Sequence, residues 1–143
     1  MYVADAKRLT AAGARKIMDT AIARARQENI AVTVAIVDGA GHLLLLERMD
    51  GGKFHSIHSA TTKAVCAASN KRSTGSTGAV GQSLDVLHAL GLALAAGPER
   101  WTAMEGGCPV MAGNECIGAV GVAGGNWEFD ERLAKEAAAS IKG

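Results

Sequence analysis

The sequence predicts an α/β (α+β) domain in which a largely antiparallel sheet lies between helices. Helical and strand-like patterns follow one another in the order helix, two strands, two helices, about three strands, helix. The first two strand-like runs are joined by the turn Asp38-Gly39-Ala40-Gly41, which is typical of an antiparallel hairpin. The run Leu43–Leu46 is continuously apolar, so we expect helices to cover both faces of its strand.

The composition favours one domain spanning residues 1–143. Hydrophobic residues make up 48% of the chain and aromatic residues only 3%, so the interior is built from small and aliphatic side chains. A net charge of +1 gives no electrostatic reason to expect a nucleic-acid partner. The apolar runs are too short to span a bilayer, so no membrane partner is expected. Three cysteines without a C-x-x-C pair are typical of reduced thiols, and we expect a cytoplasmic protein.

The first helix is predicted to follow Thr10, whose hydroxyl can cap it, and to end near Asn29. Its apolar residues recur at helical spacing and predict a face that packs on the core. These residues are Ala14, Ile17, Met18, Ala21, Ile22 and Ala25. The β-branched run at 30–37 predicts the first strand, and residues 42–48 predict the second strand of the hairpin.

The middle of the chain predicts two helices separated by a glycine-rich loop. The first spans about Ser56 to Asn70 and has a face of small side chains that allows close approach to the sheet. Ser83 is the expected cap of the second helix, which ends at Gly97-Pro98. That second helix is apolar nearly all round, so we expect it to contact another subunit.

Three short strands and a last helix complete the chain. The strands are predicted at 101–104, 108–111 and 116–122, with a turn at 112–114 between the last two. Asn126 is the expected cap of the last helix. Acidic residues in its first turn suit the positive end of the helix dipole.

Several blocks of this sequence, in order and at fitting spacing, resemble the GlcG/HbpS family. That family includes the C-terminal domain of PduO-type proteins and small proteins encoded with diol and glycerol dehydratases. The blocks are Val34–His42, Glu47–Gly51, Ser59–Ala64, Gly81–Leu84, Gly106–Val110, Ile117–Val122 and Asp130-Glu131. Together they cover most of the chain from Val32 to Ala134, and the set is specific although no single block is.

The resemblance implies a profilin-like fold with a five-stranded antiparallel sheet between helices. It also implies a homo-oligomer, with dimers that build larger assemblies, often octamers. Several relatives bind haem, and others are associated with corrinoid or glycolate metabolism. Two departures stand out: no histidine precedes His42, and Ala123-Gly124 stands where the family usually has Ser-Gly.

Two histidines are the candidate haem ligands. His55 and His58 are three residues apart at the start of a predicted helix, and this spacing can place both rings on one side. Each could ligate a haem iron or a metal ion, or both could be ordinary polar residues at a helix start. Met49 is a candidate second axial ligand, with core packing as the alternative. No separate metal site is predicted.

Charged residues in the family-like blocks are candidates for binding an acidic ligand. Arg48 and Lys63 could hold a carboxylate or the propionates of a tetrapyrrole, with Asp38 orienting Arg48 across the hairpin and Asp50 close by. The alternative is a salt-bridge network that ties the hairpin to the helix. If Lys63 is buried, its amine could act as a base near neutral pH.

The glycines of the last third have two alternative explanations. They are Gly106, Gly107, Gly118, Gly121, Gly124 and Gly125. Their missing side chains could leave room for a flat ligand, or they could let two subunits pack backbone to backbone. The second explanation is slightly favoured.

These observations lead to three hypotheses. The first is a haem- or tetrapyrrole-binding homo-oligomer, accessory to a catabolic pathway. Its expected ligand-binding residues are Arg48, Met49, Asp50, His55, His58, Lys63, Gly106, Gly107, Gly124 and Gly125. The second is a small isomerase, deaminase or hydrolase acting on an organic acid, in which Arg48 binds the carboxylate and Lys63, Asp38 or a histidine moves a proton. The third is an assembly partner of a larger enzyme, with 84–96 as the contact.

Overall fold

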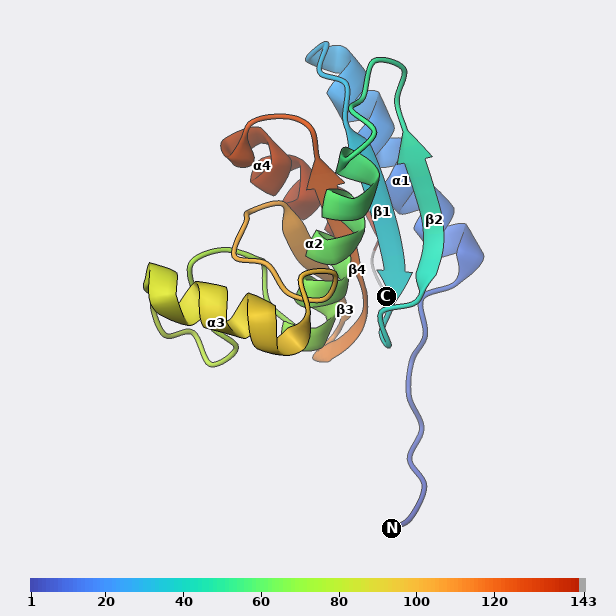
Figure 1. Ribbon diagram of the computed structural model, residues 1–143. Coiled ribbons are helices and arrows are strands. Elements are labelled where there is room, and N and C mark those ends of the chain that lie inside the picture. The colour runs from blue at the N-terminus through green and yellow to red at the C-terminus, as the bar shows by residue number, and fades with distance from the viewer. Residues whose placement is uncertain (142–143) are drawn as a thin grey trace.

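A four-stranded antiparallel sheet organises the computed structural model, which describes residues 1–141 (Figure 1). Its strands are β1 (Thr33–Asp38), β2 (Leu43–Arg48), β3 (Gly107–Ala112) and β4 (Glu115–Ala123), in the order β2-β1-β4-β3. The helices are α1 (Ala11–Gln27), α2 (Ser56–Asn70), α3 (Val86–Ala96) and α4 (Trp127–Ala138). The predicted α+β class and antiparallel pairing are confirmed. The expected fifth strand is wrong, since residues 1–141 form four.

The segment predicted as the extra strand, 101–104, is a loop that crosses over α2. The Cys66 thiol on α2 donates a hydrogen bond to the carbonyl of Thr102, so this segment lies beside the helix and away from the sheet edge. The sheet is therefore bounded by β2 and β3. On the edge strand β2, Leu43 and Leu46 remain 49% and 37% exposed. The expectation that both faces of this strand are covered is therefore wrong.

Side-chain caps fix three of the helix starts. Thr10 Oγ1 accepts a hydrogen bond from the amide of Gly13 at 3.0 Å, and Asn126 Oδ1 accepts one from Phe129 at 2.8 Å. Both caps were predicted and are confirmed. Helix α3 begins later than expected because Asp85 caps it, accepting from the amide of His88 at 2.8 Å. Ser83 lies in the preceding loop, where it forms an isolated bridge with Thr77.

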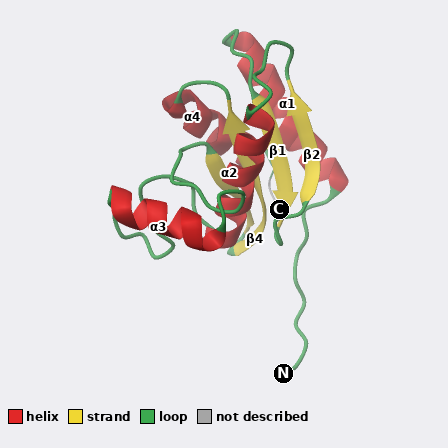
Figure 2. Ribbon diagram, viewed as in Figure 1, coloured by secondary structure: helices red, strands yellow, loops and turns green. Residues whose placement is uncertain are grey.

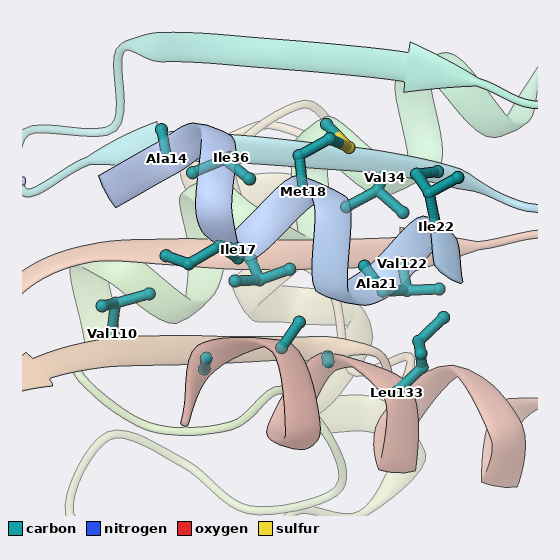
Figure 3. Close-up of a cluster of buried hydrophobic side chains, with 14 of the residues drawn as sticks. Ala14, Ile17, Met18, Ala21, Ile22, Val34, Ile36, Val110, Val122 and Leu133 are labelled. Atoms are coloured by element: carbon teal, nitrogen blue, oxygen red, sulfur yellow. The ribbon is translucent and has the colours of Figure 1, made fainter. Parts of the chain in front are cut away.

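Helices α1 and α4 cover one face of the sheet, and we call this side the packed face (Figures 1 and 2). Its core consists of large aliphatic side chains that interdigitate between the helices and the strands (Figure 3). Ile17 and Met18 from α1, Val34 and Ile36 from β1 and Leu133 from α4 are all buried there. The apolar stripe predicted for the first helix is confirmed as core packing.

Helix α2 alone covers the opposite face, which we call the α2 face (Figure 2). Its core consists almost entirely of alanines, and the backbones come very close. A Cβ atom on Gly121 would overlap the carbonyl oxygen of Ala60, and one on Gly107 would overlap that of Lys63. These two glycines therefore let α2 pack against β4 and β3 within one chain. The sequence had suggested a flat ligand or a second subunit at this place.

Helix α3 stands off from the rest of the molecule (Figure 1). None of its residues, all of which the structure describes, is buried, and Val86, Leu87 and Leu94 are largely exposed. The first residues of the chain extend away from the sheet as an arm. Within residues 1–141, no helix combines the length and the apolar character needed to cross a membrane.

Candidate functional site

A buried ion pair joins the middle of α2 to the first turn of α4. Lys63 Nζ lies 3.4 Å from Asp130 Oδ2 and donates a hydrogen bond to the carbonyl of Val122 at 2.8 Å. Asp130 Oδ1 accepts from the amide of Gly125 at 3.0 Å. Lys63 is 7% exposed and Asp130 is 3% exposed. The close approach of α2 to the sheet thus brings a lysine onto the end of β4.

Burial moves the pKa values of the two partners toward each other. Desolvation lowers the pKa of Lys63, although the charges of Asp130 and Glu105 act in the opposite direction. Desolvation raises the pKa of Asp130, against the effect of Lys63 and the Gly125 amide. The difference between the pKa values of this amine and this carboxylate is therefore smaller than between the same groups in water. Such pairs are suited to acid–base chemistry.

Two adjoining hollows meet at Lys63. The first, which we call the groove, has a volume of about 470 Å³ and runs between α2 and α3. The second, which we call the polar cavity, has a volume of about 260 Å³ and lies between the starts of α2 and α4. Ser59, Lys63 and Met104 line both of them. The groove falls in the size range of small-molecule sites, and the polar cavity lies just below it.

The groove is mostly apolar. Val86, Leu90 and Ala93 of α3 form one wall, and Trp101 contributes from the crossing loop. The α2 wall carries His58 and Thr62. The hydroxyl of Thr62 is buried and has no hydrogen-bond partner among the described atoms.

The two candidate histidines face different hollows. His58 lines the groove, whereas His55 lines the polar cavity. His55 also meets the ring of Phe54 edge-on, with the ring centres 6.0 Å apart. The three-residue spacing thus does not bring the two rings to one ligand position. His58 faces the more apolar of the two hollows.

The charged residues of the hairpin lie elsewhere. Arg48, Met49 and Asp50 line a separate depression at the end of β2, and Met49 also packs against the core. Asp38 lies at the other end of the hairpin, where its carboxylate accepts from the amides of Ala40 and His42 at 2.9 and 3.0 Å. Arg48 pairs with Thr33, a strand's length away. The expected orientation of Arg48 by Asp38 is therefore wrong.

The glycines divide between two roles. Gly124 and Gly125 line the polar cavity. Gly106 adopts φ +122°, where a side chain is strained, and it places its carbonyl to accept from the amide of Val122 at 2.8 Å. Gly107 contacts the backbone of α2.

Sequence reasoning missed many of the residues that line these hollows, and among them are Lys53, Thr62, Met104 and Asp130. Thr62 and Asp130 lie in family-like blocks but were not named as site residues, and Lys53 and Met104 gave no signal. Lys63 and Asp130 are 67 residues apart, and only the packing of α2 on β4 brings them together. Among the described residues, no group of three or more histidine, cysteine, aspartate or glutamate side chains is placed to hold a metal ion.

The sequence from residue 9 to 139 matches the family described as "Haem degrading protein HbpS-like". The chain belongs to the HbpS-like family. It is 33% identical over 129 residues to a 15.0 kDa protein of the dhaT-dhaS intergenic region of Citrobacter freundii, covering 90% of this chain and 89% of that protein.

Solved structures of HbpS-like proteins superpose closely on this chain. Klebsiella pneumoniae protein ORFY gives a TM-score of 0.84 with 34% identity, covering 98% of this chain and 95% of that one. PduOC, solved as a complex with heme, gives a TM-score of 0.83 with 28% identity, covering 94% and 96%. The resemblance read from the sequence is thus confirmed, and the family includes haem-binding members.

Proposed function

We propose that this protein binds haem, or a related tetrapyrrole, in the groove between α2 and α3, where His58 would hold the iron. The observation that carries the proposal is the placement of this imidazole on the α2 wall, opposite the apolar residues of α3. Haem sites combine an imidazole ligand with a largely apolar pocket. The haem complex of PduOC supports the choice of ligand.

The residues of the groove fit a flat, mostly apolar group. Val86, Leu90 and Trp101 offer apolar contact. Met104 lies at the junction with the polar cavity and is a candidate for a second contact to the iron. Bound haem would supply an iron centre with redox and ligand-binding chemistry. Arg48, Met49 and Asp50 line another depression and take no part in this proposal.

A titration with hemin tests the proposal. The wild-type protein is expected to develop a shifted Soret band that saturates at one equivalent per chain. His58→Ala should lose that shift. His55→Ala is the matched control and should keep it, because this ring faces the polar cavity. An unchanged wild-type spectrum, or full binding by His58→Ala, contradicts the proposal.

We further propose that the protein assembles as a homo-oligomer. The exposed apolar side chains of α3 (Val86, Leu87 and Leu94) support this, since such a face on a lone helix is typical of a protein–protein contact. A light-scattering mass that is a multiple of the chain mass is expected. A monomer at micromolar concentration contradicts it.

A second candidate function is a small enzyme that moves a proton on an organic acid. The observation that favours it is the Lys63–Asp130 pair on the wall of the polar cavity, with the pKa values of both groups moved toward each other. In this reading Lys63 is the base and Asp130 the positioning residue. Asp38 lies at the other end of β1 from the pair, and Arg48 lines a separate depression and not the polar cavity. This candidate requires the polar cavity to bind a carboxylate.

A further inference from the structure

The polar cavity is a built recess with its own charge pattern. It lies where α2 and α4 both begin, and the end of β4 forms its floor. Its charged lining residues are Lys53, Lys63 and Asp130. Lys63 and Asp130 neutralise each other. Lys53 forms no ion pair within residues 1–141, so the lining has an excess of one positive charge before any contribution from His55.

The hydrogen bonds of the ion pair leave one donor of Lys63 without an acceptor. Both oxygens of Asp130 are engaged, Oδ1 by the amide of Gly125 and Oδ2 by Lys63. The ammonium of Lys63 has three N–H groups, of which Val122 and Asp130 take two. One N–H of a nearly buried ammonium therefore stays available beside the cavity. Lys53 adds a flexible ammonium at its rim.

The surroundings of Lys63 include one more charge. Glu105 is near enough to raise the pKa of Lys63, but it does not line the cavity. Asp130, which is paired with Lys63, is therefore the acidic residue of the lining, and Ser59, Met104 and the glycines 124–125 line the rest of the wall near the ammonium. Gly124 and Gly125 carry no side chains that would fill the space. A small anion has room to approach the ammonium beside these glycines.

We propose that the polar cavity binds a carboxylate group, held between the ammonium groups of Lys63 and Lys53. Its volume of about 260 Å³ suits a small monocarboxylic acid. The carboxylate arm of a tetrapyrrole is the other source, because the groove opens into the cavity at Lys63 and Met104. That second source rests on the proposed haem site, whereas the first source does not. Two ammonium donors on one carboxylate give charge-assisted hydrogen bonds.

Propanoate is the probe for the free acid. It is titrated into the full chain and followed by the NMR shifts of the amides of Gly124 and Gly125. We expect saturable binding, and Lys53→Gln should raise the Kd about tenfold, since one charge-assisted hydrogen bond is lost. Lys16→Gln is the matched control. It makes the same substitution on the exposed side of α1, across the sheet, and should leave the Kd unchanged.

Hemin and its dimethyl ester test the other source, since the ester keeps the macrocycle but has no carboxylates. If the tetrapyrrole arm is the occupant, hemin should bind about tenfold more tightly than the ester, and Lys53→Gln should remove that difference. Either the propanoate effect or the hemin–ester difference supports the carboxylate site. The proposed carboxylate site is overturned if propanoate does not bind and the ester binds as tightly as hemin. It is also overturned if Lys53→Gln and Lys16→Gln give the same Kd values in both titrations.

The outcomes separate this inference from the proposed function. Binding of propanoate by a protein that leaves the hemin spectrum unchanged would remove the haem proposal and keep the carboxylate site. Lys63→Met should weaken propanoate more than Lys53→Gln does. Because Lys63 is buried, Lys63→Met can fail to fold. The test is therefore decided by Lys53→Gln, since Lys53 is exposed.

Discussion

The two faces of the sheet are packed in opposite ways. On the packed face, long aliphatic side chains from α1 and α4 fill the space above the strands (Figure 3). On the α2 face, alanine and glycine bring one helix so close that its backbone touches the backbone of the strands. The large-side-chain layer is a cluster of apolar residues. The thin layer has the buried Lys63–Asp130 pair and both hollows at its margin. The groups suited to chemistry thus lie beside the face that is packed through backbone contact.

The largest expected loss of stability comes from a substitution on the α2 face, where one added carbon atom has no room. Gly121→Ala should destabilise the protein by about 5 kcal/mol or more, because the new Cβ overlaps the backbone carbonyl of Ala60 and backbone cannot rotate away. Urea denaturation measures the change. Gly91→Ala is the control, since that glycine of α3 has open space around it and should gain slightly from the better helix former. Equal stability of wild type and Gly121→Ala would refute the close contact.

The second largest loss of stability is expected when the buried Lys63–Asp130 ion pair is broken. Asp130→Asn keeps the shape of the side chain but leaves Lys63 buried without its carboxylate, which should destabilise the fold by about 3 kcal/mol at neutral pH. Loss of Asp130 lowers the pKa of Lys63 further below its ordinary value of 10.5. At pH values between this lowered pKa and 10.5, Lys63 is protonated in the unfolded chain but not in the folded one. The stability of the variant therefore rises with pH over this range.

Denaturation of wild type and Asp130→Asn across pH 7 to 10 checks this sign. The deficit of the variant should shrink as the pH rises toward the ordinary lysine value. A deficit that is constant or that widens over this range would show that Lys63 is not the group left uncompensated.

The smallest expected loss of stability comes from a substitution on the packed face. Ile17→Val removes one carbon from a fully buried side chain and should cost about 1 kcal/mol, because neighbouring aliphatic groups can relax into part of the space. The same denaturation series measures it beside Gly121→Ala. If removal of a carbon here proved as costly as addition of one at Gly121, the contrast between the two faces would fail.

The sequence was sufficient for features that depend on neighbours along the chain. The caps at Thr10 and Asn126, the hairpin turn and the apolar stripe of α1 all follow from residues within a few positions of one another. The segment 101–104 has a strand-like composition, but whether it joins the sheet depends on what lies beside it, and there it meets α2. No local pattern carries that information.

The candidate site was harder for the same reason. His58 and Lys63 were named from the sequence, but their partners come from distant segments: Asp130 from α4 and Val86 from α3. The family-like blocks drew attention to Arg48 and Asp38, which the hairpin holds at its opposite ends. Lys53 lies in a loop and has no periodic neighbours, so only the cavity reveals it.

The contact of α2 with the strands also determines how the groove can open. Backbone atoms that touch at Gly121 and Gly107 have no rotamers to absorb a displacement, so α2 cannot slide or tilt without lifting from the whole sheet. Helix α3 has no such anchor. If a molecule binds in the groove, α3 is therefore the wall that we expect to move, and the imidazole of His58 on α2 should keep its position relative to the strands.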